Sequence, residues 1–203
     1  MIKLFTLNSN PDGPCITPKA GARTLTVSRP VARWSTMPPE IYGGSMECAA
    51  YDELSDLLAA HGCADLPALM RQRPGDRCVA IENVIIDGSV GKGPGVIKLT
   101  SLFRRPASMS RAAFMAHYPN NHAPLVRKTP ELPRYVQNYA LEETVDLPQS
   151  FDAVAELWWP DREMAIRSWS SDAVQVDQAK DCEIFIARGV TLFGDERYVV
   201  DNR

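Results

Sequence analysis

The sequence lacks the features of membrane-spanning, secreted and nucleic-acid-binding chains. It contains no run of about 18 apolar residues, and its N-terminal apolar stretch is too short for a signal peptide. Its lysines and arginines form no basic patch, and its formal net charge is −3 at pH 7. We therefore expect neither a membrane nor a nucleic acid as a partner, and we expect a cytoplasmic protein.

Cysteine pairs at metal-binding spacing are also missing. Five cysteines occur, at positions 15, 48, 63, 78 and 182, and no two of them form a CxxC pair. Thiols in this number and at this spacing fit neither a disulfide framework nor a zinc site. We therefore interpret them as reduced side chains that pack like small apolar residues.

Phosphate-binding motifs are absent as well. The segment Asp87–Gly95 holds four glycines and one proline, but it contains no GK[ST] sequence and no helical pattern follows it. The segment is therefore predicted to be a linker. It divides the 203 residues of the chain into a domain over residues 1–88 and a domain over residues 96–203.

The sequence after the linker shows the order β-α-β-β-α-β, which is typical of a ferredoxin-like domain. Apolar and β-branched runs predict its strands, and Ser110 is the N-cap expected before the helical sequence RAAFMAH. The predicted strands cover residues 96–105, 133–143, 151–159 and 183–200, and a second predicted helical region covers residues 160–181.

The sequence before the linker repeats part of this order. IKLFTLN at Ile2 corresponds to IKLTSLF at Ile97, an offset of 95 residues, whereas ARTLTVSRPV at Ala22 corresponds to PRYVQNYALE at Pro133, an offset of 111. The difference of 16 residues falls where the first helix belongs, and the sequence there, SNPDGPCITPKAG, is typical of a loop. We predict an α+β fold of two ferredoxin-like half-barrels, of which the first has lost most of its first helix.

Two of the three histidines, His117 and His122, lie five residues apart inside one helical pattern. A metal site, an acid/base site and simple packing are the three interpretations of this pair. A metal site fits poorly, because helical ligand pairs are spaced by four residues and Pro119 intervenes. We expect neither a metal nor a cofactor. Acid/base use fits better, because the ordinary pKa of histidine, about 6.5, lies near physiological pH.

Two predicted strands carry polar side chains that suit such a site. Tyr135 and Gln137 share one strand face, whereas Asn138 points to the other face. Glu156 and Trp158 share a face of the next strand, and burial of that face would raise the pKa of Glu156. An open face would instead make Glu156 an ordinary surface residue.

For the partners of the histidines and for the lining of a pocket, the sequence offers several candidates. The carboxylates expected to orient a histidine are those of Glu156, Glu131 and Asp152. Aromatic side chains that would line a pocket, or else pack in the core, are those of Phe103, Tyr118, Trp158 and Trp159.

The sequence SRAAFMAHYPNNHAPLVRKTPELPRYVQNY, followed by FDAVAELWW, resembles an EthD-domain protein of the dimeric α+β barrel superfamily. The resemblance covers residues 96–203 and rests on the phenylalanine before a His-aromatic pair and on HAPL, RYVQN and Glu-Leu-Trp. It implies a barrel and a ligand pocket between sheet and helices. Strand edges left over from two half-barrels need cover, so we expect a homodimer, although a barrel closed within one chain would cover the same edges. Pro119 departs from the pattern and is predicted to end the first helix in a bend.

The resemblance and the residues together predict an enzyme that acts on a small aromatic or polyketide-like carbonyl compound by proton transfer, as in dehydration, cyclisation or isomerisation. The expected catalytic residues are His117, His122 and Glu156, with His117 as the proton-transfer group and His122 gating the pocket or orienting the ligand. The residues expected to bind substrate are Phe103, Tyr118, Tyr135, Gln137, Asn138 and Trp158, of which Gln137 or Asn138 would polarise the carbonyl.

Two alternatives stay open, because this superfamily hosts many unrelated reactions. One is a cofactor-free oxygenase, in which the same histidine would form a substrate carbanion that reacts with oxygen. The other is a ligand-binding or assembly module without catalytic activity.

Overall fold

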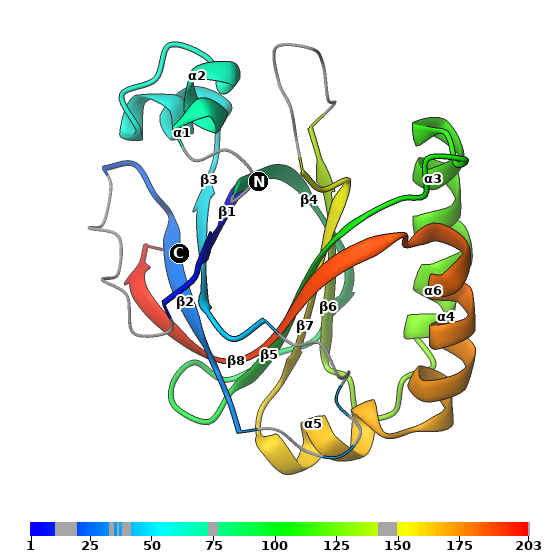
Figure 1. The fold of residues 1–203 in the computed structure, drawn as a ribbon. Coiled ribbons are helices and arrows are strands. Elements are labelled where there is room, and N and C mark those ends of the chain that lie inside the picture. Colours follow the sequence, from blue (N-terminus) through cyan, green and yellow to red (C-terminus); the bar gives the residue numbers. More distant parts are fainter. Residues whose placement is uncertain are drawn as a thin grey trace.

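The computed structural model describes residues 1–10, 20–32, 35, 37, 42–72, 77–141 and 150–202. Eight antiparallel strands form one closed barrel in the order β1-β3-β2-β8-β5-β7-β6-β4 (Figure 1). The strands are β1 (Ile2–Asn8), β2 (Thr24–Pro30), β3 (Ser45–Tyr51), β4 (Arg77–Asp87), β5 (Ile97–Arg104), β6 (Arg134–Ala140), β7 (Ala153–Trp159) and β8 (Arg188–Asp201).

The barrel consists of two halves with the same strand order. The first half runs β4-β1-β3-β2 and the second runs β8-β5-β7-β6, and the two halves join where β2 pairs with β8 and β4 pairs with β6. The predicted fold class, two ferredoxin-like half-barrels, is confirmed. Leftover strand edges were one reason to expect a homodimer, and the barrel pairs these edges within one chain. The homodimer and the domain limits at residues 88 and 96 stay predictions.

The helices are distributed unequally between the halves. α1 (Leu54–Ala60) and α2 (Leu66–Arg71) connect β3 to β4. The longer connections of the second half hold α3 (Arg111–His117), η1 (Tyr118–His122), α4 (Ala123–Val126), α5 (Arg162–Trp169), η2 (Ala173–Gln178) and α6 (Ala179–Phe185). The predicted loss of the first helix concerns residues 11–19, which lie outside the described residues.

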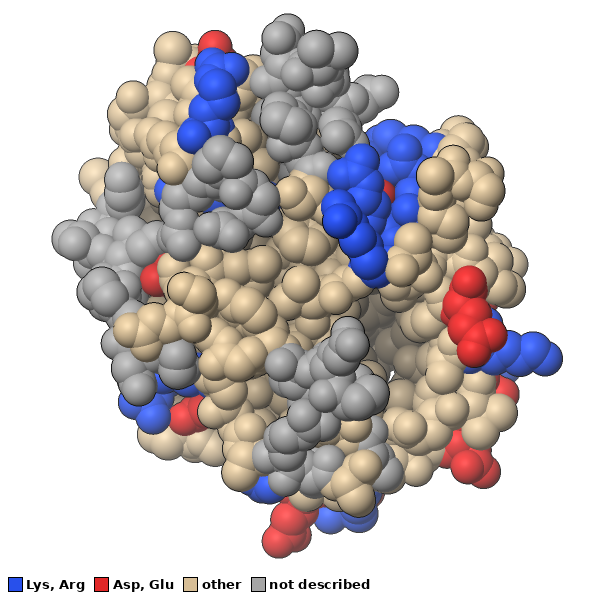
Figure 2. Space-filling view, in the orientation of Figure 1, with Lys and Arg blue, Asp and Glu red and all other residues tan. Residues whose placement is uncertain are grey.

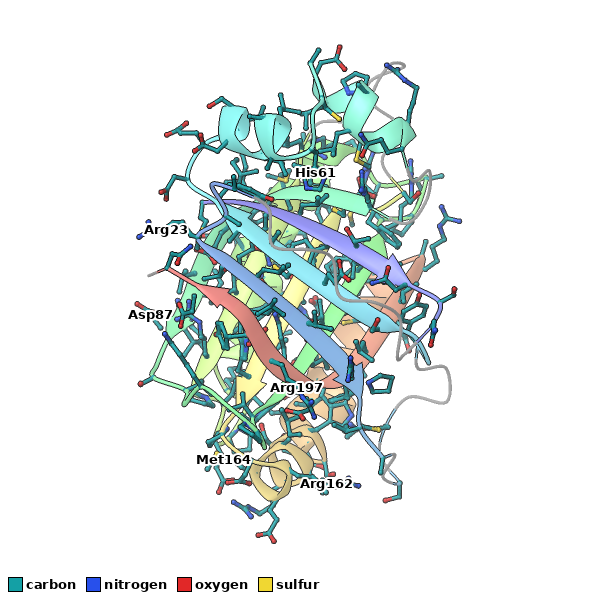
Figure 3. All side chains as sticks on the ribbon, turned by 90° about the vertical axis from the view of Figure 1, so that its left-hand side faces the viewer. Arg23, His61, Asp87, Arg162, Met164 and Arg197 are labelled. Carbon is teal, nitrogen blue, oxygen red and sulfur yellow. The ribbon has the colours of Figure 1, made fainter. Side chains whose placement is uncertain are left out.

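The second-half helices cover one side of the barrel, and those of the first half do not face them. In Figure 1, α3, α4 and α6 form a layer beside β5, β6 and β7. In Figure 3, α1 and α2 lie at one end of the strands near His61, whereas α5, with Arg162 and Met164, lies at the opposite end. The helix layer beside β5, β6 and β7 therefore comes from the second half.

Helix starts follow the capping chemistry of the sequence, but one predicted strand was too long. The Ser110 hydroxyl accepts a hydrogen bond from the Ala113 amide at 3.1 Å, so the predicted N-cap is confirmed. The strand predicted over residues 183–200 was wrong at its start, because residues 183–185 close α6. Phe185 is fully buried there against the rings of Phe103 and Phe114.

The barrel interior has an apolar end and a charged end. The apolar core includes Phe5, Leu7, Met46, Cys48, Cys78, Ala80, Leu102, Ala140, Phe151, Val154 and Leu192. At the charged end, the Glu156 carboxylate forms ion pairs with the Nζ atoms of Lys3 at 2.6 Å and Lys98 at 2.7 Å. Lys3 also pairs with Glu82 at 2.7 Å, and Lys98 pairs with Glu196 at 2.5 Å. Each buried charge is thus compensated by opposite charges.

Candidate functional site

A cavity of about 590 Å³ lies between the sheet of the second half and its helices. That volume is in the range of small-molecule sites. In the orientation of Figure 1, the space-filling surface is hollowed beside the helix layer, where the visible atoms are mostly uncharged (Figure 2). Its described lining includes Leu99, Ser101, Phe103, Tyr118, His122, Val126, Tyr135, Ala155, Leu157, Trp169, Val174, Gln175, Gln178, Cys182, Phe185 and Thr191.

His117 and His122 are linked by a π-helical turn, η1. The helix does not end at Pro119 as predicted, because helical structure continues from α3 through η1 into α4. Within η1 the Ala123 amide donates to the Tyr118 carbonyl, five residues back. A π-turn tolerates the missing amide of Pro119 and is frequent at functional sites. It also turns residues five apart onto one side, so the spacing of His117 and His122 brings their rings to one partner.

That partner is Asp181 on α6. His117 donates from Nε2 to Oδ1 of Asp181 at 2.9 Å, and His122 donates from Nδ1 to Oδ2 at 2.8 Å. An ionised carboxylate only accepts hydrogen bonds, so it holds the proton of neutral His122 on Nδ1. The other nitrogen, Nε2, is then an unprotonated acceptor. His122 lines the cavity, and no described residue bonds to Nε2.

Burial determines the charge state of His122. Burial among the aromatic rings of Tyr118 and Phe185 lowers the pKa of His122 below its ordinary value. Asp181 opposes this effect through its hydrogen bond and charge, and His117 adds to it. His122 is therefore a neutral base at physiological pH.

The structure brings together six of the nine residues expected at the site. His117, His122, Phe103, Tyr118, Tyr135 and Gln137 lie on the helix side of the sheet. Glu156, Asn138 and Trp158 lie inside the barrel, where Asn138 donates to Glu156 at 2.8 Å. The alternation of strand faces was predicted correctly, but the site was predicted across both faces.

The expectation for Glu156 is corrected by its surroundings. Its face is buried, but Lys3 and Lys98 outweigh the effect of burial and lower its pKa to about 2. Glu156 is therefore ionised at physiological pH and is not a carboxylic acid with a raised pKa. It borders a separate polar cavity of about 340 Å³ at the charged end of the barrel.

The expected orienting carboxylates have other partners. Glu131 pairs with Arg167 at 3.0 Å, and Asp152 pairs with Arg105. Asp181 was missed because it lies 64 residues after His117, in a segment with no motif of its own. His117 is the expected proton-transfer group, but of the two histidines only His122 lines the cavity, so access to the cavity favours His122.

Three further properties follow from the described residues. No group of three or more His, Cys, Asp and Glu side chains in the described ranges is arranged to hold a metal ion. None of the helices that the structure describes combines the length and apolarity needed to cross a membrane. Burial raises the pKa of the Cys182 thiol in the cavity wall to about 12, so this thiol is not an activated nucleophile.

Comparison with known proteins agrees with the fold. Residues 106–189 match the EthD domain, a range that contains the helices α3 to α6 and the strands β6 and β7. An EthD family protein from Bacillus halodurans is 26% identical, with a TM-score of 0.43, and the match covers 49% of this chain and 97% of that chain. No curated protein matches the sequence.

Two further solved structures match over nearly the whole length. An anthrone oxidase-like protein is 11% identical with a TM-score of 0.62, covering 100% of this chain and 94% of that chain. A proposed monooxygenase from Fusobacterium nucleatum subsp. nucleatum is 7% identical with a TM-score of 0.57, covering 96% and 91%. At these identities the matches establish the shared barrel fold and nothing of the chemistry.

Proposed function

We propose that this chain, which carries an EthD domain over residues 106–189, is an enzyme that removes a proton next to a carbonyl group of a small aromatic or polyketide-like molecule. The observation that carries the proposal is the His122–Asp181 pair at the wall of an apolar cavity. Asp181 sets the tautomer of His122, which leaves Nε2 free to accept the proton. The outcome would be a dehydration, a cyclisation or an isomerisation.

The lining of the cavity supports an aromatic substrate. Phe103, Tyr118, Trp169 and Phe185 present ring surfaces, and Ala155 leaves space above the sheet. The Ser101 and Thr191 hydroxyls lie 2.9 Å apart in the floor and share one hydrogen bond. Such a surface binds flat apolar molecules that carry few polar groups.

Proton removal can be measured directly, before the natural product is known. A panel of aromatic ketones is incubated with the protein in D₂O, and exchange of the carbon-bound hydrogen next to the carbonyl is followed by NMR. The proposal requires exchange that depends on the protein and on His122. A panel with no exchange, although NMR shows that its members bind the cavity, would contradict it.

A cofactor-free oxygenase is the second candidate, since the same base would form the same carbanion. The full-length match to an anthrone oxidase-like protein supports it at the level of fold. There a CH₂ group and O₂ would give a C=O group and one water, with oxygen as the oxidant. Oxygen consumption in step with substrate loss distinguishes this reaction from simple proton transfer.

The activity is expected to rise with pH along an acid limb whose midpoint lies below 6.5, the ordinary pKa of histidine. Only neutral His122 accepts a proton, and burial lowers its pKa, so the active form persists to lower pH than for an exposed histidine. Exchange rates from about pH 4 to about pH 8 would show this limb. In Asp181→Asn the limb should move further down, because the Asp181 carboxylate raises the pKa of His122. A midpoint above 6.5 would contradict the assignment.

Filling the cavity should weaken binding without unfolding the barrel. Ala155→Leu places a larger side chain in the cavity floor, and we expect at least a roughly tenfold loss of affinity for aromatic ketones. Ala112→Leu, at an exposed position of α3, is the matched control and should bind normally. Equal affinities of the two variants would place the binding site elsewhere.

A further inference from the structure

Gln137 lies between three tyrosines, and its contacts fix the orientation of its amide. Its Nε2 donates to the Tyr118 carbonyl at 2.9 Å and to the Tyr135 hydroxyl at 3.0 Å. A backbone carbonyl only accepts, so the nitrogen must point to that side. The Gln137 Oε1 is then on the other side, where it accepts from the Tyr139 hydroxyl at 2.5 Å.

This orientation gives the hydrogen-bond chain one direction. The Tyr135 hydroxyl accepts from Gln137 and donates its own proton to the Tyr118 hydroxyl oxygen, 3.3 Å away. The Tyr118 oxygen is thus an acceptor, and its own proton needs a further acceptor. None exists among the described residues, although Tyr118 is 1% exposed and lines the cavity. A buried donor without an acceptor costs about 1–3 kcal/mol.

The unused donor lies next to the base. Tyr118 and His122 stand in the same π-turn, and their rings stack with centroids 5.7 Å apart. Burial and the neighbouring Tyr135 raise the pKa of Tyr118 well above 10, so the hydroxyl keeps its proton. When a carbon next to a carbonyl loses a proton, negative charge develops on the carbonyl oxygen. A neutral donor beside the base suits this change in charge.

We infer that the Tyr118 hydroxyl donates a hydrogen bond to the carbonyl oxygen of the substrate and stabilises the enolate that forms when His122 removes the proton. The inference rests on the proposed function and deepens it, because it requires a substrate with an enolisable carbonyl or a phenol-type oxygen. It also replaces Gln137 and Asn138 in the carbonyl-polarising role. Gln137 acts as a positioning residue, and Asn138 lies on the opposite face.

The test uses 4-nitrophenol, an aromatic oxyanion whose ionised form is coloured, on the intact protein. Tyr118 should favour the bound anion, so Tyr118→Phe is expected to lower the affinity for 4-nitrophenolate about tenfold and to raise the pKa of the bound probe. Naphthalene, which has no oxygen, should bind both proteins equally. Tyr139→Phe is the matched control, because it removes a hydroxyl from the same hydrogen-bond chain, lies outside the described cavity lining and leaves the Tyr118 proton in place.

The outcomes separate this inference from the proposed function. Equal losses in Tyr118→Phe and Tyr139→Phe, or unchanged binding of the anion in Tyr118→Phe, would overturn the donor role of Tyr118. Circular dichroism confirms that each variant is folded. Selective loss in Tyr118→Phe supports the inference even when no ketone of the panel exchanges hydrogen, and in that case only the proton-transfer function fails.

Discussion

Replacement of His122 by alanine is expected to lower turnover by about 10²-fold or more, because the group that accepts the substrate proton is removed. His117→Ala should lower turnover much less, since His117 reaches the cavity only through Asp181. The measurement is the initial rate of hydrogen exchange or product formation at saturating substrate, for both variants at several pH values. Ligand affinity and thermal unfolding are measured in parallel to show that each variant is folded.

The comparison of His122→Ala with His117→Ala is well controlled, because both histidines bond to Asp181. Both substitutions remove one hydrogen bond to Asp181, so loss of that bond alone would affect both variants alike. If His117 were the base, as the sequence alone led us to expect, the order of the two variants would be reversed. Near-normal turnover in His122→Ala would mean that the proton goes to another group.

Glu156→Gln should lower the free energy of unfolding by about 3 kcal/mol, because two buried lysines lose a shared anion. Turnover of the folded variant should stay near that of the wild type, since Glu156 lies on the barrel side of the sheet. Urea unfolding gives the first quantity. Asp52→Asn is the control, because its ion pair with Arg23 is largely exposed and such pairs contribute about 1 kcal/mol or less.

The pH dependence of this difference has a definite sign. The pKa of Glu156 is lowered from 4.5 to about 2 in the folded chain, so its contribution is fully present above pH 4.5. The contribution is lost as the pH falls from 4.5 towards 2. Wild type and Glu156→Gln should therefore converge in stability in acid. Turnover abolished in a stable, folded Glu156→Gln variant would return Glu156 to the list of catalytic residues.

The fold could be predicted from the sequence because it depends on local periodicity. In β7, small Ala153 and Ala155 alternate with Val154 and Glu156, and this alternation correctly separated the helix side from the barrel side. Cap chemistry located Ser110. The internal offset between similar segments indicated two halves, because each half repeats one strand order.

The site could be predicted less completely because it depends on packing between segments far apart in the sequence. The carboxylate that orients His122 comes from α6, 59 residues later, and nothing in the sequence pairs these segments. The lysine that binds Glu156 lies 153 residues away in β1. A search for a period of 3.6 residues does not detect a π-turn. The spacing of five between the histidines therefore gave no indication that both rings contact the same side chain.

The covalent link between the two half-barrels has a thermodynamic consequence. Where two separate chains close such a barrel, its folded fraction depends on mass action and falls on dilution. Here both pairs of joining strands, β2 with β8 and β4 with β6, belong to one polypeptide. Barrel closure is therefore unimolecular, and the folded fraction of the barrel and its neighbouring cavity does not depend on protein concentration.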